Sequence, residues 1–164
     1  GKESTPTIFF KEIKREADII HFALHASIDK EDWLKSKLYF RSFNTETKAL
    51  EHRAVNGYEL AQLNIQSPLV VLSACQTGVG ANIHGEGTYS LARSFIKSGA
   101  KTIISTLWNI NAQQTSELFY HFYKLLKQEQ SSCIALSNAK VEYLKHSDEY
   151  LSFPGFWAGV ISLS

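Results

Sequence analysis

The chain has 164 residues, of which 44% are hydrophobic and 20% charged, and its formal net charge is +1. A chain of this length can bury the core of one domain, and this composition excludes an intrinsically disordered protein. The near-zero net charge argues against a nucleic-acid partner. No apolar run is long enough to span a bilayer and no signal-peptide pattern is present, so we expect no membrane partner either.

The first third of the chain predicts a helix, a strand and a less regular region. In "TPTIFFKEIKRE" (5–16) the Thr-Pro pair is typical of a helix start. "ADIIHFALHA" (17–26) is nearly continuous in apolar residues, which predicts a strand buried on both faces. Within residues 27–55, "KLYFRSF" alternates like a short strand and "KALEHRAV" is its candidate partner. "NGYELAQLNI" then predicts one or two helical turns.

The rest of the chain alternates between strands and helices. "SPLVVLSA" (67–74) and "KTIISTLW" (101–108) predict two buried strands, and "FWAGVISL" predicts the last one. "EGTYSLARSFIKSGA" predicts an amphipathic helix that ends at Gly99, and two further helices are expected over 112–128 and about 131–146. This order predicts parallel strands joined by helical crossovers, and hence an α/β sheet.

Three candidate functional positions follow the predicted strands: His25, Cys75 and the pair Trp108-Asn109. Functional groups in such sheets gather at the carboxyl ends of the strands. A thiol is mostly protonated near neutral pH and needs a nearby base to act as a nucleophile. His25 can be that base if its strand neighbours the strand before Cys75, as consecutive strands usually do. The backbone N–H groups of Cys75 and Ala26 are then the candidates for holding an oxyanion.

The two cysteines also have structural interpretations. Cys75 and Cys133 provide no disulfide framework, CxxC pair or zinc-finger spacing, which favours a reducing, cytoplasmic setting. Free cysteine is among the most buried residue types, so Cys75 suits the core as well as a nucleophile, and we expect a structural role for Cys133. His25 equally suits a packed, hydrogen-bonded position. His21 precedes it by four residues, a spacing that binds metal on a helix and not on a strand, so we expect a structural His21 and no metal site.

Two further segments have alternative interpretations. Trp108 suits either the core or one wall of a substrate pocket, which Ser105 and Asn109 would also line. The glycine-rich "GVGANIHGEG" (78–87) lacks the third glycine of a dinucleotide-binding loop and the lysine of a Walker loop. Its glycines fit a loop that moves aside from Cys75 or forms one wall of a substrate cleft.

The spacing and local sequence of His25 and Cys75 point to a known family. Cys75 follows His25 by 50 positions, close to the separation of the caspase pair, although "SACQTG" does not match the literal caspase signature. The chain resembles the CHAT family, caspase-like peptidase domains often attached to tetratricopeptide repeats in bacteria. The matching segments are "ADIIHFALHA", "LVVLSACQTGVG", "GEGTYSLARSFIKSGAKTIISTLW", "FYHFYKLL", "AL" at 135–136 and "FWAG". The resemblance runs in order over about residues 5–162.

This resemblance implies a three-layer, caspase-like α/β sandwich with a mostly parallel central sheet, formed by a single domain over residues 1–164. It also implies that the chain is related to a clan of cysteine peptidases that includes caspases, legumains, gingipains and separases. In those enzymes the residues that match His25 and Cys75 are the catalytic pair. A protein or peptide substrate is therefore implied, a tetratricopeptide-repeat or regulatory region is a candidate partner, and no cofactor is required.

The sequence departs from the family in two places. The CHAT fold normally begins with a further strand–helix–strand unit before residue 5, so we expect a fragment of a longer protein, a proteolytic product or a subunit completed by a partner. Relatives also commonly carry an acidic residue after the Leu-Trp pair, where this chain has Asn109, Asn111 and Ala112. If that acid binds a basic substrate side chain in the relatives, a preference for basic side chains is not implied for this chain. An Asn-lined or neutral pocket would replace it, which is a weaker inference.

The function expected from the sequence is that of a cysteine endopeptidase. Cys75 attacks the scissile carbonyl, and His25 transfers the protons. A second hypothesis is an inactive caspase-like module that mediates protein contacts. A third is a glutamine amidotransferase or another thiol hydrolase. We rank it low because those amidotransferases place the cysteine before the histidine in the chain, and here His25 comes first.

Overall fold

The fold is an α/β arrangement of two sheets, seen in a computed structural model that describes residues 10, 13, 17–29, 32–44, 48–73, 86–128 and 131–164. One sheet has the strand order β1-β5-β6-β7 and the other has the order β2-β3-β4. In chain order the described elements are β1 (Ile19–Phe22), β2 (His25–Ser27), the 3-10 helix η1 (Trp33–Lys35), β3 (Lys37–Asn44), β4 (Ala49–Asn56), α2 (Gly57–Ala61), β5 (Leu69–Leu72), α3 (Glu86–Lys97), β6 (Thr102–Thr106), α4 (Ala112–Leu126), α5 (Ser132–His146), the 3-10 helix η2 (Pro154–Phe156) and β7 (Val160–Leu163). The predicted helix over 5–16 lies almost entirely outside the described residues.

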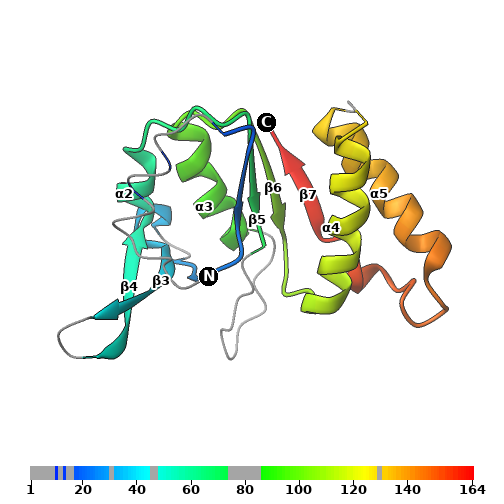
Figure 1. Ribbon diagram of the computed structural model, residues 1–164, viewed down its shortest axis with the longest axis horizontal. Coiled ribbons are helices and arrows are strands. Elements are labelled where there is room, and N and C mark those ends of the chain that lie inside the picture. Colours follow the sequence, from blue (N-terminus) through cyan, green and yellow to red (C-terminus); the bar gives the residue numbers. More distant parts are fainter. Residues whose placement is uncertain are drawn as a thin grey trace.

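The four-stranded sheet is the middle layer of three. Its strands β1, β5 and β6 are parallel, and β7 runs antiparallel to β6. Figure 1 shows α3 on one side of this sheet and α4 with α5 on the other. All four residues of β5 are buried because both of its faces are covered by helices. The predicted three-layer sandwich with a mostly parallel sheet is therefore confirmed.

Two hydrophobic clusters fill the spaces between the four-stranded sheet and the helices on either side of it. On the α3 side, Val70 and Leu72 of β5 belong to the same cluster as Phe95. On the α4 side, Leu69 and Val71 belong to a cluster with core residues of α4 and α5. Successive side chains of a strand point to opposite faces, so β5 divides its apolar residues equally between the two clusters.

The segment 17–26 differs from the prediction of one strand buried on both faces. It forms two short strands, β1 and β2, that belong to different sheets and are separated by Ala23 and Leu24. Among the described strands, β1 lies at the edge of its sheet, so Phe22 is buried whereas Ile19 and His21 are exposed. The apolar run was interpreted as continuous because nothing in its composition marks the point where the chain leaves the first sheet.

The three-stranded sheet has one buried face. The predicted pairing of "KLYFRSF" with "KALEHRAV" is confirmed, since β3 and β4 pair antiparallel along their whole length. Leu38, Phe40 and Val55 are almost fully buried and belong to the cluster on the α3 side. Tyr39 and Arg41 alternate with these residues along β3, so they point to the opposite face of the sheet.

The ends of the helices follow their sequence signals. Asn56 and Glu59 form a reciprocal capping box at the start of α2. The Asn111 side chain accepts a hydrogen bond from the backbone of Gln113 at the start of α4. The chain turns after α3 at Gly99, whose φ of +111° favours glycine, and an added Cβ would lie 2.7 Å from the carbonyl oxygen of Ile65. The predicted end of this helix is confirmed.

Candidate functional site

The carboxyl ends of β1 and β5 lie side by side. The two strands pair in parallel, with Phe22 opposite Leu72. Just beyond this pair, the backbone N–H of Ser73 donates to the carbonyl oxygen of Phe22 over 2.9 Å. The predicted adjacency of the strand before His25 and the strand before Cys75 is thus present. Cys75 itself and most of the glycine-rich segment 78–87 lie outside the described residues.

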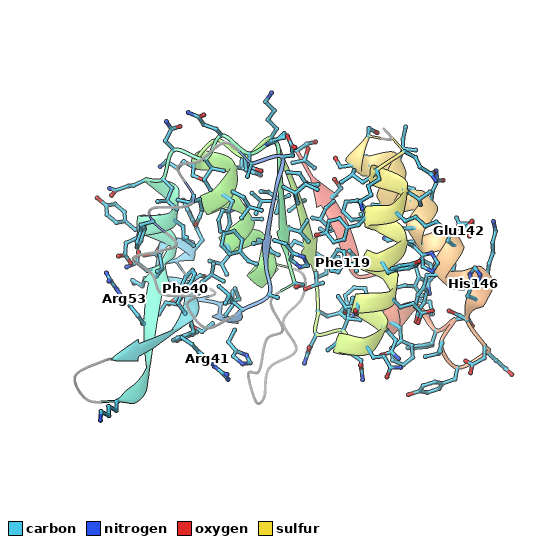
Figure 2. All side chains as sticks on the ribbon, viewed as in Figure 1. Phe40, Arg41, Arg53, Phe119, Glu142 and His146 are labelled. Atoms are coloured by element: carbon cyan, nitrogen blue, oxygen red, sulfur yellow. The ribbon has the colours of Figure 1, made fainter. Side chains whose placement is uncertain are left out.

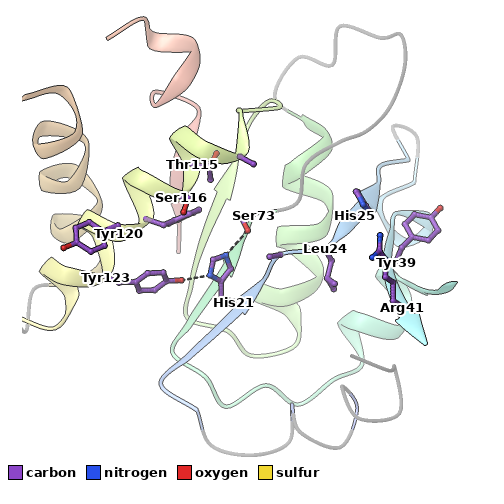
Figure 3. Close-up of a pocket in the computed structure, with 13 residues that line it drawn as sticks. His21, Leu24, His25, Tyr39, Arg41, Ser73, Thr115, Ser116, Tyr120 and Tyr123 are labelled. Atoms are coloured by element: carbon purple, nitrogen blue, oxygen red, sulfur yellow. Dashed lines mark hydrogen bonds between the residues drawn. The ribbon is translucent and has the colours of Figure 1, made fainter. Parts of the chain in front are cut away.

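A cleft of about 850 Å³ opens next to these strand ends. Figure 3 shows residues of α4 on one side of it and residues of β2 and β3 on the other. Both Ser73 and the predicted base His25 belong to its lining. The described lining residues are His21, Ala23, Leu24, His25, Tyr39, Arg41, Ser73, Ala112, Thr115, Ser116, Phe119, Tyr120 and Tyr123.

His21 lies at the centre of a hydrogen-bond chain that joins β1, the end of β5 and α4 (Figure 3). Its Nε2 lies 2.8 Å from Ser73 Oγ, and its Nδ1 lies 2.9 Å from the Tyr123 hydroxyl. Ser73 Oγ also donates to the Phe22 carbonyl over 3.4 Å. Because Ser73 has one hydroxyl proton, it accepts from Nε2–H of His21, and Nδ1 accepts from Tyr123. These directions satisfy all three hydrogen bonds with a neutral imidazole.

The surroundings of this chain favour uncharged side chains. The Phe119 ring packs edge-on against His21, with ring centroids 5.4 Å apart. Partial burial lowers the pKa of His21 from its ordinary value of 6.5, although one part of the ring stays open to the cleft. Burial also raises the pKa of Tyr123 to about 12, so its hydroxyl remains a donor at neutral pH. These three side chains are therefore uncharged at neutral pH. Their hydrogen bonds connect Ser73, which precedes Cys75 by two residues, to β1 and α4.

The two predicted residues next to each other in β2 have different surroundings. His25 is exposed and pairs with Tyr39 of β3, so the structure brings it into the cleft. Ala26 has a buried side chain and pairs with Leu38. It lies in the middle of β2, and the role of its backbone N–H at an oxyanion stays a prediction.

The other predicted pocket residues lie outside the described lining of the cleft. Ser105 is buried in β6, and no described group bonds its hydroxyl. Trp108 is 43% exposed and donates from Nε1 to the carbonyl oxygen of Gly155 over 2.8 Å. A Cβ at Gly159 would come within 2.5 Å of the Trp108 ring, so this glycine leaves room for the indole. Asn109 is exposed, and a pocket formed by these residues stays a prediction.

Sequence reasoning missed four of the residues that shape the cleft: Ser73, Tyr123, Tyr39 and Arg41. Tyr123 has the helical spacing of a core residue, and only its hydroxyl distinguishes its role. Ser73 precedes Cys75 by two positions, and its closeness to the predicted nucleophile is the signal in the sequence for a place near the site. The signal for Tyr39 and Arg41 is the alternation in "KLYFRSF", which puts both residues on the face of the strand opposite Leu38 and Phe40.

A metal centre and a membrane-spanning helix are both absent from the described part of the chain. Within the ranges given above, no group of three or more His, Cys, Asp or Glu side chains is arranged to hold a metal ion. None of the described helices has the length and apolar character needed to cross a membrane.

Comparison with known proteins places the chain in a family. The family model described as "CHAT domain" matches residues 1–164. Tetratricopeptide repeat protein 28 of Mus musculus is 28% identical over 110 residues, which is 67% of this chain and 4% of that protein. The human protein of the same name is 24% identical over 110 residues, with the same shares. The chain thus spans about 4% of the length of these curated relatives. On the family match over its whole length, the chain belongs to the CHAT domain family.

Proposed function

We propose that residues 1–164 form a single caspase-like domain that acts as a cysteine endopeptidase, with Cys75 as nucleophile and His25 as base. The observation that supports this most is the parallel pairing of β1 with β5. It brings together the strand end before His25 and the strand end before Cys75. Ser73, two residues before Cys75, and His25 line the same cleft.

The proposed reaction is an acyl transfer to sulfur followed by hydrolysis. His25 accepts the thiol proton, and the Cys75 thiolate attacks the scissile carbonyl carbon. The tetrahedral oxyanion accepts hydrogen bonds from the backbone N–H groups of Cys75 and Ala26. The C–N bond then breaks, and His25 protonates the leaving amine. Water, deprotonated by His25, hydrolyses the thioester and releases the acid and the free thiol.

A thiol-reactive peptide probe tests this proposal. We expect covalent labelling of the unmodified chain, loss of labelling in Cys75→Ala and His25→Ala, and retained labelling in Cys133→Ala. Cys133 is a suitable control because it is exposed and therefore accessible to the reagent. Labelling that stays at Cys133 and never occurs at Cys75 would instead favour the inactive protein-interaction module.

We also propose that a tetratricopeptide-repeat region is a regulatory partner of this domain. Both relatives are named as tetratricopeptide repeat proteins, which supports an association of the two kinds of region in one chain. Adding such a region from the natural source protein should change the rate of probe labelling at Cys75. An unchanged rate would argue against regulation by that region.

A further inference from the structure

One side of the cleft carries an arginine whose charge is not neutralised by any described side chain. Leu38 and Phe40 of β3 point into the core and are 0% and 3% exposed. The alternation of the strand therefore directs Tyr39 and Arg41 to the open face. His25 lies directly opposite Tyr39 across the antiparallel pair. Figure 3 shows these three side chains together, across the cleft from α4.

The charge of this side is unbalanced within the described part of the chain. Among the described lining residues, Arg41 is the one with a permanent charge, and none is an Asp or Glu. The ion pairs found between described residues, Lys35–Asp32 and Lys145–Glu142, lie elsewhere. The facing part of α4 adds neutral hydroxyl groups from Thr115 and Ser116. A guanidinium in such a cleft attracts anions, and its planar fork matches a carboxylate.

We propose that the cleft selects peptides with an acidic side chain, an aspartate or glutamate, whose carboxylate binds Arg41. The inference rests on the proposed function in one respect, since it takes the occupant of the cleft to be a peptide. The size of the cleft, about 850 Å³, is sufficient for several residues of an extended chain. Arg41 is thereby a specificity-determining residue with no part in the chemical steps.

Binding to the Cys75→Ala variant tests this selection apart from catalysis. The probes are three pools of fluorescein-labelled octapeptides with Glu, Gln or Lys fixed at one position and neutral residues elsewhere. Fluorescence anisotropy should show the Glu pool binding about tenfold more tightly than the Gln pool, which corresponds to about 1.4 kcal/mol. The Lys pool should bind most weakly. The advantage of the Glu pool should shrink as salt is added.

The arginine of the neighbouring strand provides a matched control. Arg53 is exposed, pairs with Phe40 and lies on the other side of the hairpin, outside the described lining of the cleft (Figure 2). Arg41→Gln should remove the difference between the Glu and Gln pools, whereas Arg53→Gln should keep it. Because both side chains are exposed, neither substitution should shift the thermal unfolding midpoint appreciably.

The outcomes separate this inference from the proposed function. Equal binding of the Glu and Gln pools, or an unchanged preference in Arg41→Gln, overturns the inference even if the chain cleaves peptides. Absence of labelling at Cys75 overturns the proposed catalysis, while a Glu preference that depends on Arg41 still supports selection of acidic peptides.

Discussion

The two walls of the cleft differ in how their polar groups are used. In the hydrogen-bonded wall, formed by His21, Ser73 and Tyr123, each side chain has a partner within the protein. In the cationic wall, formed by His25, Tyr39 and Arg41, the charged group has no carboxylate partner among the described residues. A satisfied neutral network holds backbone segments in place, whereas an unbalanced charge is available to a ligand. The difference indicates that the hydrogen-bonded wall holds the strand ends in place, whereas the cationic wall offers an unpaired charge to a ligand.

The largest expected effect comes from removing the ring behind the hydrogen-bonded wall. Phe119 is 4% exposed and contacts both His21 and Tyr123. Phe119→Ala should lower the free energy of unfolding by about 3–5 kcal/mol, as large-to-small core substitutions do. Urea denaturation measures this loss. Phe153→Ala is the control, since Phe153 is 65% exposed, and equal effects of the two substitutions would contradict the assigned packing.

Replacing each of the two histidines by alanine compares the two walls directly. His21→Ala should lower the free energy of unfolding by about 1–3 kcal/mol, because Ser73 and Tyr123 lose their partner. His25→Ala should change it by less than about 0.5 kcal/mol, as is usual for an exposed position. Under the proposed function the order is reversed for labelling at Cys75, which His25→Ala abolishes and His21→Ala only slows.

Rescue distinguishes a positioning role of His21 from a general loss of stability. His21→Gln can keep a donor near Ser73 Oγ, so it should recover much of the labelling rate lost in His21→Ala. Equal rates for the two variants would show that the hydrogen bond to Ser73 does not position the segment that follows it.

The layers of the fold could be predicted from the sequence because apolar residues in strands and helices have distinct periods. The strand β5, with four buried residues, and the helix α4, with one apolar stripe, were predicted correctly for this reason. The break after Phe22 could not be predicted, since it depends on which sheet each half of the segment joins. The same limit applies to the candidate site. His25 was found from its place after a strand, whereas His21 acquires its role from Tyr123, which is 102 positions away in the sequence.

A smaller effect is expected from removing one hydroxyl group of the hydrogen-bonded wall. Tyr123→Phe leaves the ring in place and removes only the donor to His21 Nδ1. The free energy of unfolding should fall by about 0.5–1.5 kcal/mol, the usual net value of one hydrogen bond. Tyr120→Phe is the matched control, because Tyr120 also lies on α4 and in the lining of the cleft but is 66% exposed. A larger loss for Tyr120→Phe would contradict the hydrogen-bond chain.

The smallest expected effect is a dependence of stability on pH that arises from His21. Its pKa is lower in the folded protein than the ordinary value of 6.5, so below about that pH the unfolded chain binds more protons than the folded one. The contribution of His21 to stability is therefore complete above pH 6.5 and declines as the pH falls toward the folded pKa. Unfolding curves between pH 7.5 and pH 5 should show this decline, and His21→Gln should make it shallower. An unchanged slope in His21→Gln would contradict the assignment of this decline to His21.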